Sequence, residues 1–226
     1  MRRLLAFLTV LAFLIVLWRL FRPSPPRSQP DDASPVTISK LPVVFATHTF
    51  DPTAPPPDMP PLGAHETAEC DSNFQSSAIV RGEPRKTDAT HANLTITDVK
   101  VTLRLSINLW LPKEAPQNLI DHEEGHRQIS EHTYETADKL AERIAASYIG
   151  KQVEIAGADL NAESAKVLHE LAAEITAEYS KQLNPNPPQL LYDSITDHAK
   201  NGVVARDAVD HVLKNAAIET PAAQSQ

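Results

Sequence analysis

The most regular stretch of the chain is an alternation of apolar and polar residues from Asp98 to Leu111. Successive side chains of a β-strand point to opposite faces, so a period of two predicts a long strand with one buried face. Residues 66–81 and the run 36–50 show the same tendency more weakly and are expected to form further strands. The predicted buried face of the long strand consists of Val99, Val101, Leu103, Leu105, Ile107, Leu109 and Leu111.

Beyond Pro112 the apolar residues recur at steps of three and four, which is typical of α-helices. We expect one uninterrupted helix from Leu119 to Ile149, a second from about Ala162 to Leu183 that is broken by Asn184–Pro188, and a third over roughly Val203–Ile218. Strands come first and helices follow. This order predicts an α+β fold in which N-terminal antiparallel strands precede a long helix and a helical hairpin.

The ends of the chain have a different character from this domain. Residues 1–22 contain an apolar run, Leu4–Trp18, with arginines on both sides and no small-residue cleavage pattern, so we expect an uncleaved signal anchor. A proline- and serine-rich stalk, 23–35, leads to the domain at 36–220, and 221–226 is expected to be a disordered tail. The domain would then lie in the periplasm or outside the cell; secretion after signal-peptide cleavage is the alternative.

The net charge, the cysteine content and the length of the chain exclude several classes of protein. The net charge of −8 argues against nucleic-acid binding, which requires a basic surface. Cys70 is the only cysteine, so an internal disulfide is impossible. The chain is long enough for one domain with its own core, but not for two large ones.

The residues with the clearest chemical meaning lie in the first predicted helix, where His122-Glu123-Glu124-Gly125-His126 matches the pattern H-E-x-x-H. Residues four apart lie on one helical face, about one turn from each other, so both imidazoles can reach one zinc ion. Glu123 lies beside that face and is expected to act as the general base that takes a proton from the attacking water.

His132 gives the wider spacing H-E-x-x-H-x5-H, which is the ligand spacing of the metzincins. In those proteins a glycine ends the helix three residues after the second histidine, but this chain has Ile129 at that position. In a continuous helix His132 points about 120° away from His126. We therefore do not expect His132 to bind the metal.

A second motif follows the second helix, in Tyr192-Asp193-Ser194-Ile195-Thr196-Asp197-His198. Together with H-E-x-G-H, it resembles a family of bacterial exported proteins that are predicted zinc-dependent proteases and are catalogued as a domain of unknown function. That family carries Tyr-Asp-x-x-Thr-x-His-Gly, and Ala199 stands here at the position of its glycine. The resemblance would cover about residues 36–200, and it implies a secreted or periplasmic metallopeptidase of zincin-like fold.

The resemblance also implies His198 as the third zinc ligand, and a helical hairpin could return it to the first helix. The residues alone leave other ligands open, namely Asp193 and Asp197 after the second helix and, on that helix, Glu163, Glu170, Glu174 and Glu178. Tyr192 is expected either to donate a hydrogen bond to the oxyanion of a tetrahedral intermediate or to pack in the core.

Several polar clusters have simpler explanations than chemistry. Strand-edge polarity explains His65, Glu66, Glu69 and Cys70 better than a second metal site does. Asp207 and His211 are spaced as a solvated helical pair. Trp110 lies on the polar side of its strand, where we expect it to contact the stalk or a partner.

Taken together, these patterns predict a membrane-anchored, zinc-dependent, peptidase-like hydrolase that acts on a protein or peptide. By analogy with zincins, the 98–111 strand would pair with the substrate backbone. Two alternatives remain open: an anchored binding or assembly module with a structural zinc, and a metal-free helical interaction domain.

Overall fold

A computed structural model of the chain describes residues 34–63 and 66–219, with the side chains of 216–219 left aside. The chain divides into two compact units, 1–34 and 35–226. The predicted anchor, the stalk up to residue 33, and the predicted tail lie outside the described residues. Within the described part, no helix is long and apolar enough to cross a membrane.

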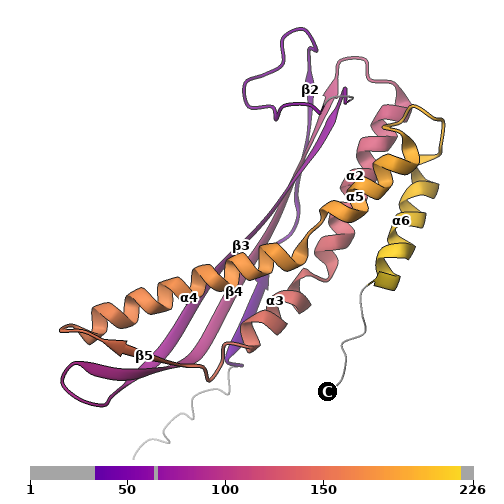
Figure 1. The fold of residues 1–226 in the computed structure, drawn as a ribbon. Helices are drawn as coiled ribbons and strands as arrows, with labels where there is room; N and C mark the ends of the chain where they lie inside the picture. The colour runs from indigo at the N-terminus through magenta and orange to yellow at the C-terminus, as the bar shows by residue number, and fades with distance from the viewer. Residues whose placement is uncertain (1–33, 64–65, 220–226) are drawn as a thin grey trace, which may run out of the picture. The chain divides into compact units, whose positions relative to one another are not determined.

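The second unit is a mixed α/β domain built on a five-stranded sheet (Figure 1). Its central strand is β4 (His91–Pro112), which extends the predicted 98–111 strand at its N-terminal end. All seven residues of the predicted apolar face are buried. The hydrophobic alternation therefore identified both the strand and its inner face correctly.

β4 is paired along both of its edges. On one edge lies β3 (Glu69–Lys86), antiparallel along its whole length. The other edge carries three short strands in succession: β5 (Gln152–Ala156), β1 (Val36–Lys40) and β2 (Val44–Phe50). Since both edges of β4 are occupied, the expectation that this segment pairs with a substrate is wrong.

The prediction of an antiparallel sheet is also wrong in part, because β1 and β2 run parallel to β4. β1 and β2 are separated only by residues 41–43, and they pair with successive stretches of β4, 99–103 and 106–112, so both strands run in one direction. The chain then crosses to β3, and β4 returns between β3 and the first two strands. β5 adds a strand after the first helices, which the order of elements along the sequence did not predict.

The predicted single helix 119–149 is two helices, α2 (Gln117–Glu135) and α3 (Ala137–Ala146), which meet at Thr136. A contact from the distant strand β1 stabilises the interruption. The Nζ of Lys40 donates to the carbonyl oxygen of Glu135 at 2.8 Å and to the carboxylate of Asp138 at 3.1 Å. A carbonyl at the end of α2 thereby gains a hydrogen bond that a continuous helix would have supplied.

The remaining helices cover the sheet and pack against α2. α4 (Leu160–Leu183) lies across β3 and contributes Leu160, Ile175 and Tyr179 to the main core (Figure 1). α5 (Asn186–Thr196) and α6 (Ala205–Glu219) pack against α2 and form a smaller core with it. The second and third predicted helices correspond to α4 and α6, whereas α5 was expected to be a loop.

Candidate metal centre

α2 places the H-E-x-x-H residues on its buried side. His122 and Glu123 are only 3% and 5% exposed, and His126 is half-buried. The two imidazoles lie one turn apart on the same face, with their Nε2 atoms separated by 3.2 Å. The predicted geometry of the motif is therefore present.

α5 supplies the second half of the centre. Its first residues are Asn186, Pro187 and Pro188, and prolines suit the first turn because the amide groups there have no partner within the helix. The prolines that were expected only to break a helix thus begin a new one. From there, side chains at helical spacing face α2: Gln189, Tyr192, Asp193 and Thr196.

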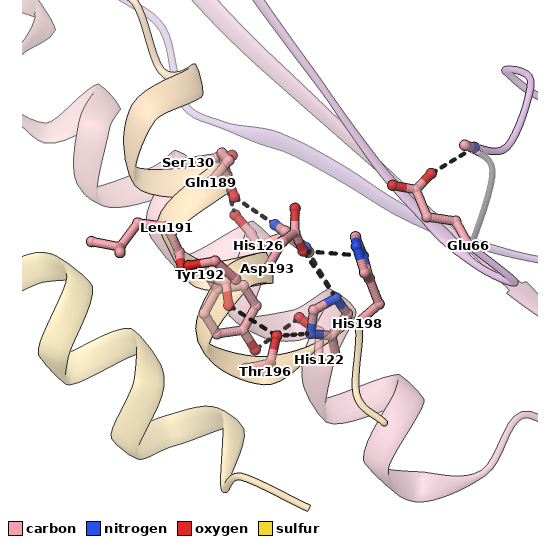
Figure 2. Close-up of polar contacts among 12 residues, drawn as sticks. Glu66, His122, His126, Ser130, Gln189, Leu191, Tyr192, Asp193, Thr196 and His198 are labelled. Carbon is pink, nitrogen blue, oxygen red and sulfur yellow. Dashed lines mark hydrogen bonds and ion pairs between the residues drawn. The ribbon is translucent and has the colours of Figure 1, made fainter. Parts of the chain in front are cut away.

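Three potential ligand atoms form a small triangle in this interface (Figure 2). Oδ1 of Asp193 lies 2.9 Å from Nε2 of His126 and 3.4 Å from Nε2 of His122, and the two Nε2 atoms are 3.2 Å apart. Zinc bonds of about 2.0–2.2 Å in tetrahedral geometry separate ligand atoms by roughly 3.3–3.6 Å. The triangle is close to that size, so these three residues could hold a metal ion.

The hydrogen bonds behind the two histidines fix which nitrogen faces the centre. Nδ1 of His126 lies 2.6 Å from Oε1 of Gln189, an oxygen that can only accept, so this nitrogen must donate. The Thr196 hydroxyl donates to the carbonyl oxygen of Tyr192 and accepts from Nδ1 of His122 at 3.2 Å. Both Nε2 atoms are thereby free to offer lone pairs, an arrangement typical of metal-bound histidines.

The Asp193 carboxylate strengthens the case for a cation. Within the described residues its buried Oδ1 accepts no hydrogen bond of good geometry, although both imidazoles are close to it. Burial works against the ionised carboxylate, but His122 and His126 hold the pKa of Asp193 well below its usual range. The Nε2 lone pairs of His122 and His126 and the Oδ1 atom of Asp193 converge on one point. Such a set of ligand atoms suits a divalent metal ion.

The imidazoles respond differently to this environment. Burial lowers the pKa of His122 despite the nearby Asp193 carboxylate. Burial also acts to lower the pKa of His126, but the nearby Asp193 carboxylate and the hydrogen bond with Gln189 raise it above its ordinary value. In the metal-free protein a proton on His126 therefore competes with the metal, so metal binding should release it.

Glu123 faces a cleft of about 290 Å³ that also contains the three candidate ligands. Burial raises the pKa of Glu123 to about 8; the nearby His126 opposes this shift, and Glu69 and Glu66 add to it. The opposite wall of the cleft is the start of β3, including Glu69, Cys70 and Ser72. The predicted general base is thus buried at the wall of the same cleft as the candidate ligands.

His198, the third ligand implied by the family resemblance, is not one of the three grouped residues. It lines the cleft, and its Nδ1 lies 3.6 Å from Oδ1 of Asp193. The backbone around it is left-handed at three consecutive residues, with φ of 46° at Asp197, 50° at His198 and 67° at Ala199. Asp193, which the sequence left open as a ligand, lies closer to the two histidines of α2.

Tyr192 has a structural position rather than the predicted catalytic one. Its side chain is completely buried, and its hydroxyl donates to the main-chain oxygen of His122 at 3.2 Å. Its ring also stacks on the imidazole of His122, at a centroid distance of 5.0 Å. Gly125 makes this contact possible, because a Cβ at that position would collide with the Tyr192 hydroxyl. Tyr192 does not line the cleft, and its position fits the expected core role rather than the oxyanion role.

The other candidate ligands lie elsewhere. His132 forms an ion pair with Glu135 at 3.2 Å and is not part of the group, as its helical position predicted. Asp197 is exposed. None of the four α4 glutamates lines the cleft: Glu163, Glu170, Glu174 and Glu178.

The proposed second metal cluster is not found among the described residues, from which His65 is missing. Glu66 accepts a hydrogen bond from the Gly63 amide, and burial raises the pKa of the Cys70 thiol to about 12. Trp110 is buried and stacks on His48 at 4.2 Å, so it is not a free contact surface. His211 is exposed and contacts Asn215.

Gln189 and Ser130 were missed from the sequence. The amide nitrogen of Gln189 donates to Ser130 and to the main-chain oxygen of His126, while its oxygen holds the His126 ring. The signal was present in the spacing, because Gln189 stands four residues before Asp193 and directly after two prolines. Recognising it required treating 186–196 as a helix.

No protein-family model, no curated protein and no solved structure matches the chain in comparisons with each of the three. The resemblance to the exported protease-like family therefore depends on the two motifs alone. The function has to be argued from the geometry of the centre itself.

Proposed function

We propose that this chain is a zinc-dependent, peptidase-like hydrolase with Glu123 as its general base. The observation that carries the proposal is the convergence of His122, His126 and Asp193 in a cleft whose wall also contains a buried glutamate. Three protein ligands with a fourth position open toward a cleft are typical of catalytic zinc sites.

Each residue has a defined task in this proposal. His122, His126 and Asp193 would hold the zinc, and Gln189 and Thr196 would orient the two imidazoles. A zinc ion bound there would supply Lewis acidity and would lower the pKa of a water molecule bound to it to about 7. Glu123 takes the proton from the attacking water and passes it to the leaving amine. A carboxylate close to a dication remains ionised more readily than the same carboxylate without it.

The position of β3 supports a polypeptide substrate. No strand of the described residues pairs with the outer edge of β3, and the first residues of this strand face α2 across the cleft. Unpaired main-chain groups at a strand edge can bind an extended peptide. An H-E-x-x-H helix below such an edge is the arrangement of zincins, so a zincin-like fold and membership of the exported family are parts of the proposal.

The N-terminal segment gives the proposed cellular context. Residues 1–22 would anchor the protein in a membrane, and the domain would lie in the periplasm or outside the cell.

A structural zinc site is the second candidate, and one observation favours it. His198 lies beside Asp193, so a small shift of its side chain would bring a fourth protein ligand to the metal. A structural site is closed by four protein groups and leaves no position for water. In that case the domain would bind a partner without cutting it.

Replacing Glu123 by glutamine separates the two candidates. The amide is nearly isosteric with the carboxylate but cannot accept the proton, so Glu123→Gln should retain zinc and lose about 10²–10⁴-fold in hydrolysis of an unfolded protein. Mass spectrometry of the products measures the hydrolysis, and emission spectroscopy measures the zinc. Equal hydrolysis by both proteins would rule out Glu123 as the base, and absence of hydrolysis in the parent protein would favour the structural site.

A further inference from the structure

A second pocket, with a volume of about 700 Å³, opens beside the metal cleft. Seven of its 17 lining residues are prolines, and Phe50, Met59, Leu62 and Leu119 add further apolar surface. Most of these residues belong to the proline-rich segment between β2 and β3. We call this the proline pocket.

The proline pocket adjoins the metal cleft. Four residues line both spaces: Glu66, Thr67, Leu119 and His198. An extended ligand with one part at the metal centre is therefore within reach of the proline pocket.

The two spaces differ sharply in chemical character. The metal cleft is lined by several carboxylates, among them Glu66, Glu69 and Glu123, and by no lysine or arginine of the described residues. The proline pocket is mainly apolar, and its volume falls within the 300–1,000 Å³ that is common for ligand sites. A matching ligand has a polar part beside a bulky apolar part, as a peptide bond beside large apolar side chains does.

The walls of the proline pocket are also stiff. Each proline ring fixes φ near −65°, so these residues have little backbone freedom to lose when a ligand binds. A preformed apolar site binds more tightly than one that must first be ordered. The high proline content thus has a physical consequence for binding.

We propose that the proline pocket binds bulky apolar side chains next to the cleavage point of a polypeptide substrate, and so determines which sequences are cut. This inference rests on the proposed function, because it takes the metal cleft as the place where the peptide bond lies. Shortening an apolar side chain in the substrate removes its burial in the pocket. A charge placed in the pocket wall should likewise weaken the binding of an apolar side chain there.

The test compares two peptides of otherwise identical sequence. The bulky peptide has leucine and phenylalanine beside the cleavage point, and the small peptide has alanine at both of these positions. The parent protein should cleave the bulky peptide about 10–200-fold more efficiently in kcat/KM. Met59→Arg should abolish this preference, and Leu62→Arg provides a second variant in case the first does not fold. Val44→Arg is the matched control, since Val44 is an apolar residue that is 65% exposed on β2 and lines neither space.

Binding of the same peptides in the Glu123→Gln background, followed by fluorescence anisotropy, separates the two proposals. Preferential binding that is lost in Met59→Arg, without cleavage by the parent, would overturn the proposed function and support the pocket. Cleavage of both peptides at similar rates, or a preference that survives both pocket variants, would overturn the pocket proposal. Absence of both binding and cleavage would overturn both.

Discussion

We call the packing of β4 against α3 and α4 the sheet end, and the place where α2 meets α5 and the start of β3 the metal end. The two regions are built on opposite principles. At the sheet end, the apolar face of β4 packs against α3 and α4 in a core of hydrophobic residues. At the metal end, four of the five buried polar or charged residues of the described part of the chain gather where α2 meets α5 and β3: His122, Glu123, Ser130 and Thr196. Buried polar groups reduce stability unless they are paired.

Backbone strain is also concentrated at the metal end. Three of the five non-glycine residues with positive φ among the described residues are Asp197, His198 and Ala199, directly after α5. Left-handed backbone costs roughly 1–2 kcal/mol per residue. Strain and buried polarity are concentrated at functional sites, where the geometry matters more than stability. The hydrophobic core is therefore concentrated at the sheet end, whereas buried polar groups and backbone strain are concentrated at the metal end.

The largest expected effect comes from weakening the sheet end. Leu103 is completely buried in the centre of β4, so Leu103→Ala should lower the free energy of unfolding by about 2–5 kcal/mol. Urea unfolding of the metal-free protein measures this change. The control is Leu190→Ala, because Leu190 is 66% exposed and should change stability by less than about 0.5 kcal/mol. Similar losses in both variants would contradict the assignment of the core.

A smaller effect, of opposite sign, is expected at the metal end. Ala199 has a φ of 67°, which glycine adopts without steric cost, so Ala199→Gly should stabilise the metal-free protein by about 0.5–1 kcal/mol. For a domain of this size, this should raise the Tm by roughly 1–4 °C. The same substitution at Ala165, exposed within α4, should instead destabilise by about 1 kcal/mol. Destabilisation by Ala199→Gly would show that the left-handed segment is not strained.

The two ends also differ in how far the sequence predicts them. The alternation in 98–111 records burial on one face of a strand, so β4 and its inner face were predicted correctly. The interruption at Thr136 was not predictable, because Lys40, which donates to the carbonyl oxygen of Glu135, is 95 residues away from Glu135 along the chain. Likewise, the parallel pairing of β1 and β2 depends on β4 returning between strands that precede it in sequence.

At the metal end, local spacing predicted His122, Glu123 and His126, because the H-E-x-x-H geometry is contained within one helix. The third ligand depends on how α5 packs on α2, and periodicity does not determine such long-range contacts. Asp193 was one of several open alternatives, and the preferred His198 lies next to it. Gly125 was noticed only as part of a motif, although its contact with Tyr192 is what allows the two helices to approach.

The most direct test of the metal centre is the zinc content of the full chain, measured by emission spectroscopy after purification without chelators. The account predicts one zinc per chain for the parent protein and for His198→Ala, and a strong loss of affinity for Asp193→Ala at the same pH. Less than about a tenth of an equivalent in the parent, with no uptake of added zinc, would contradict the metal centre. Full zinc in Asp193→Ala with loss in His198→Ala would contradict the assigned third ligand.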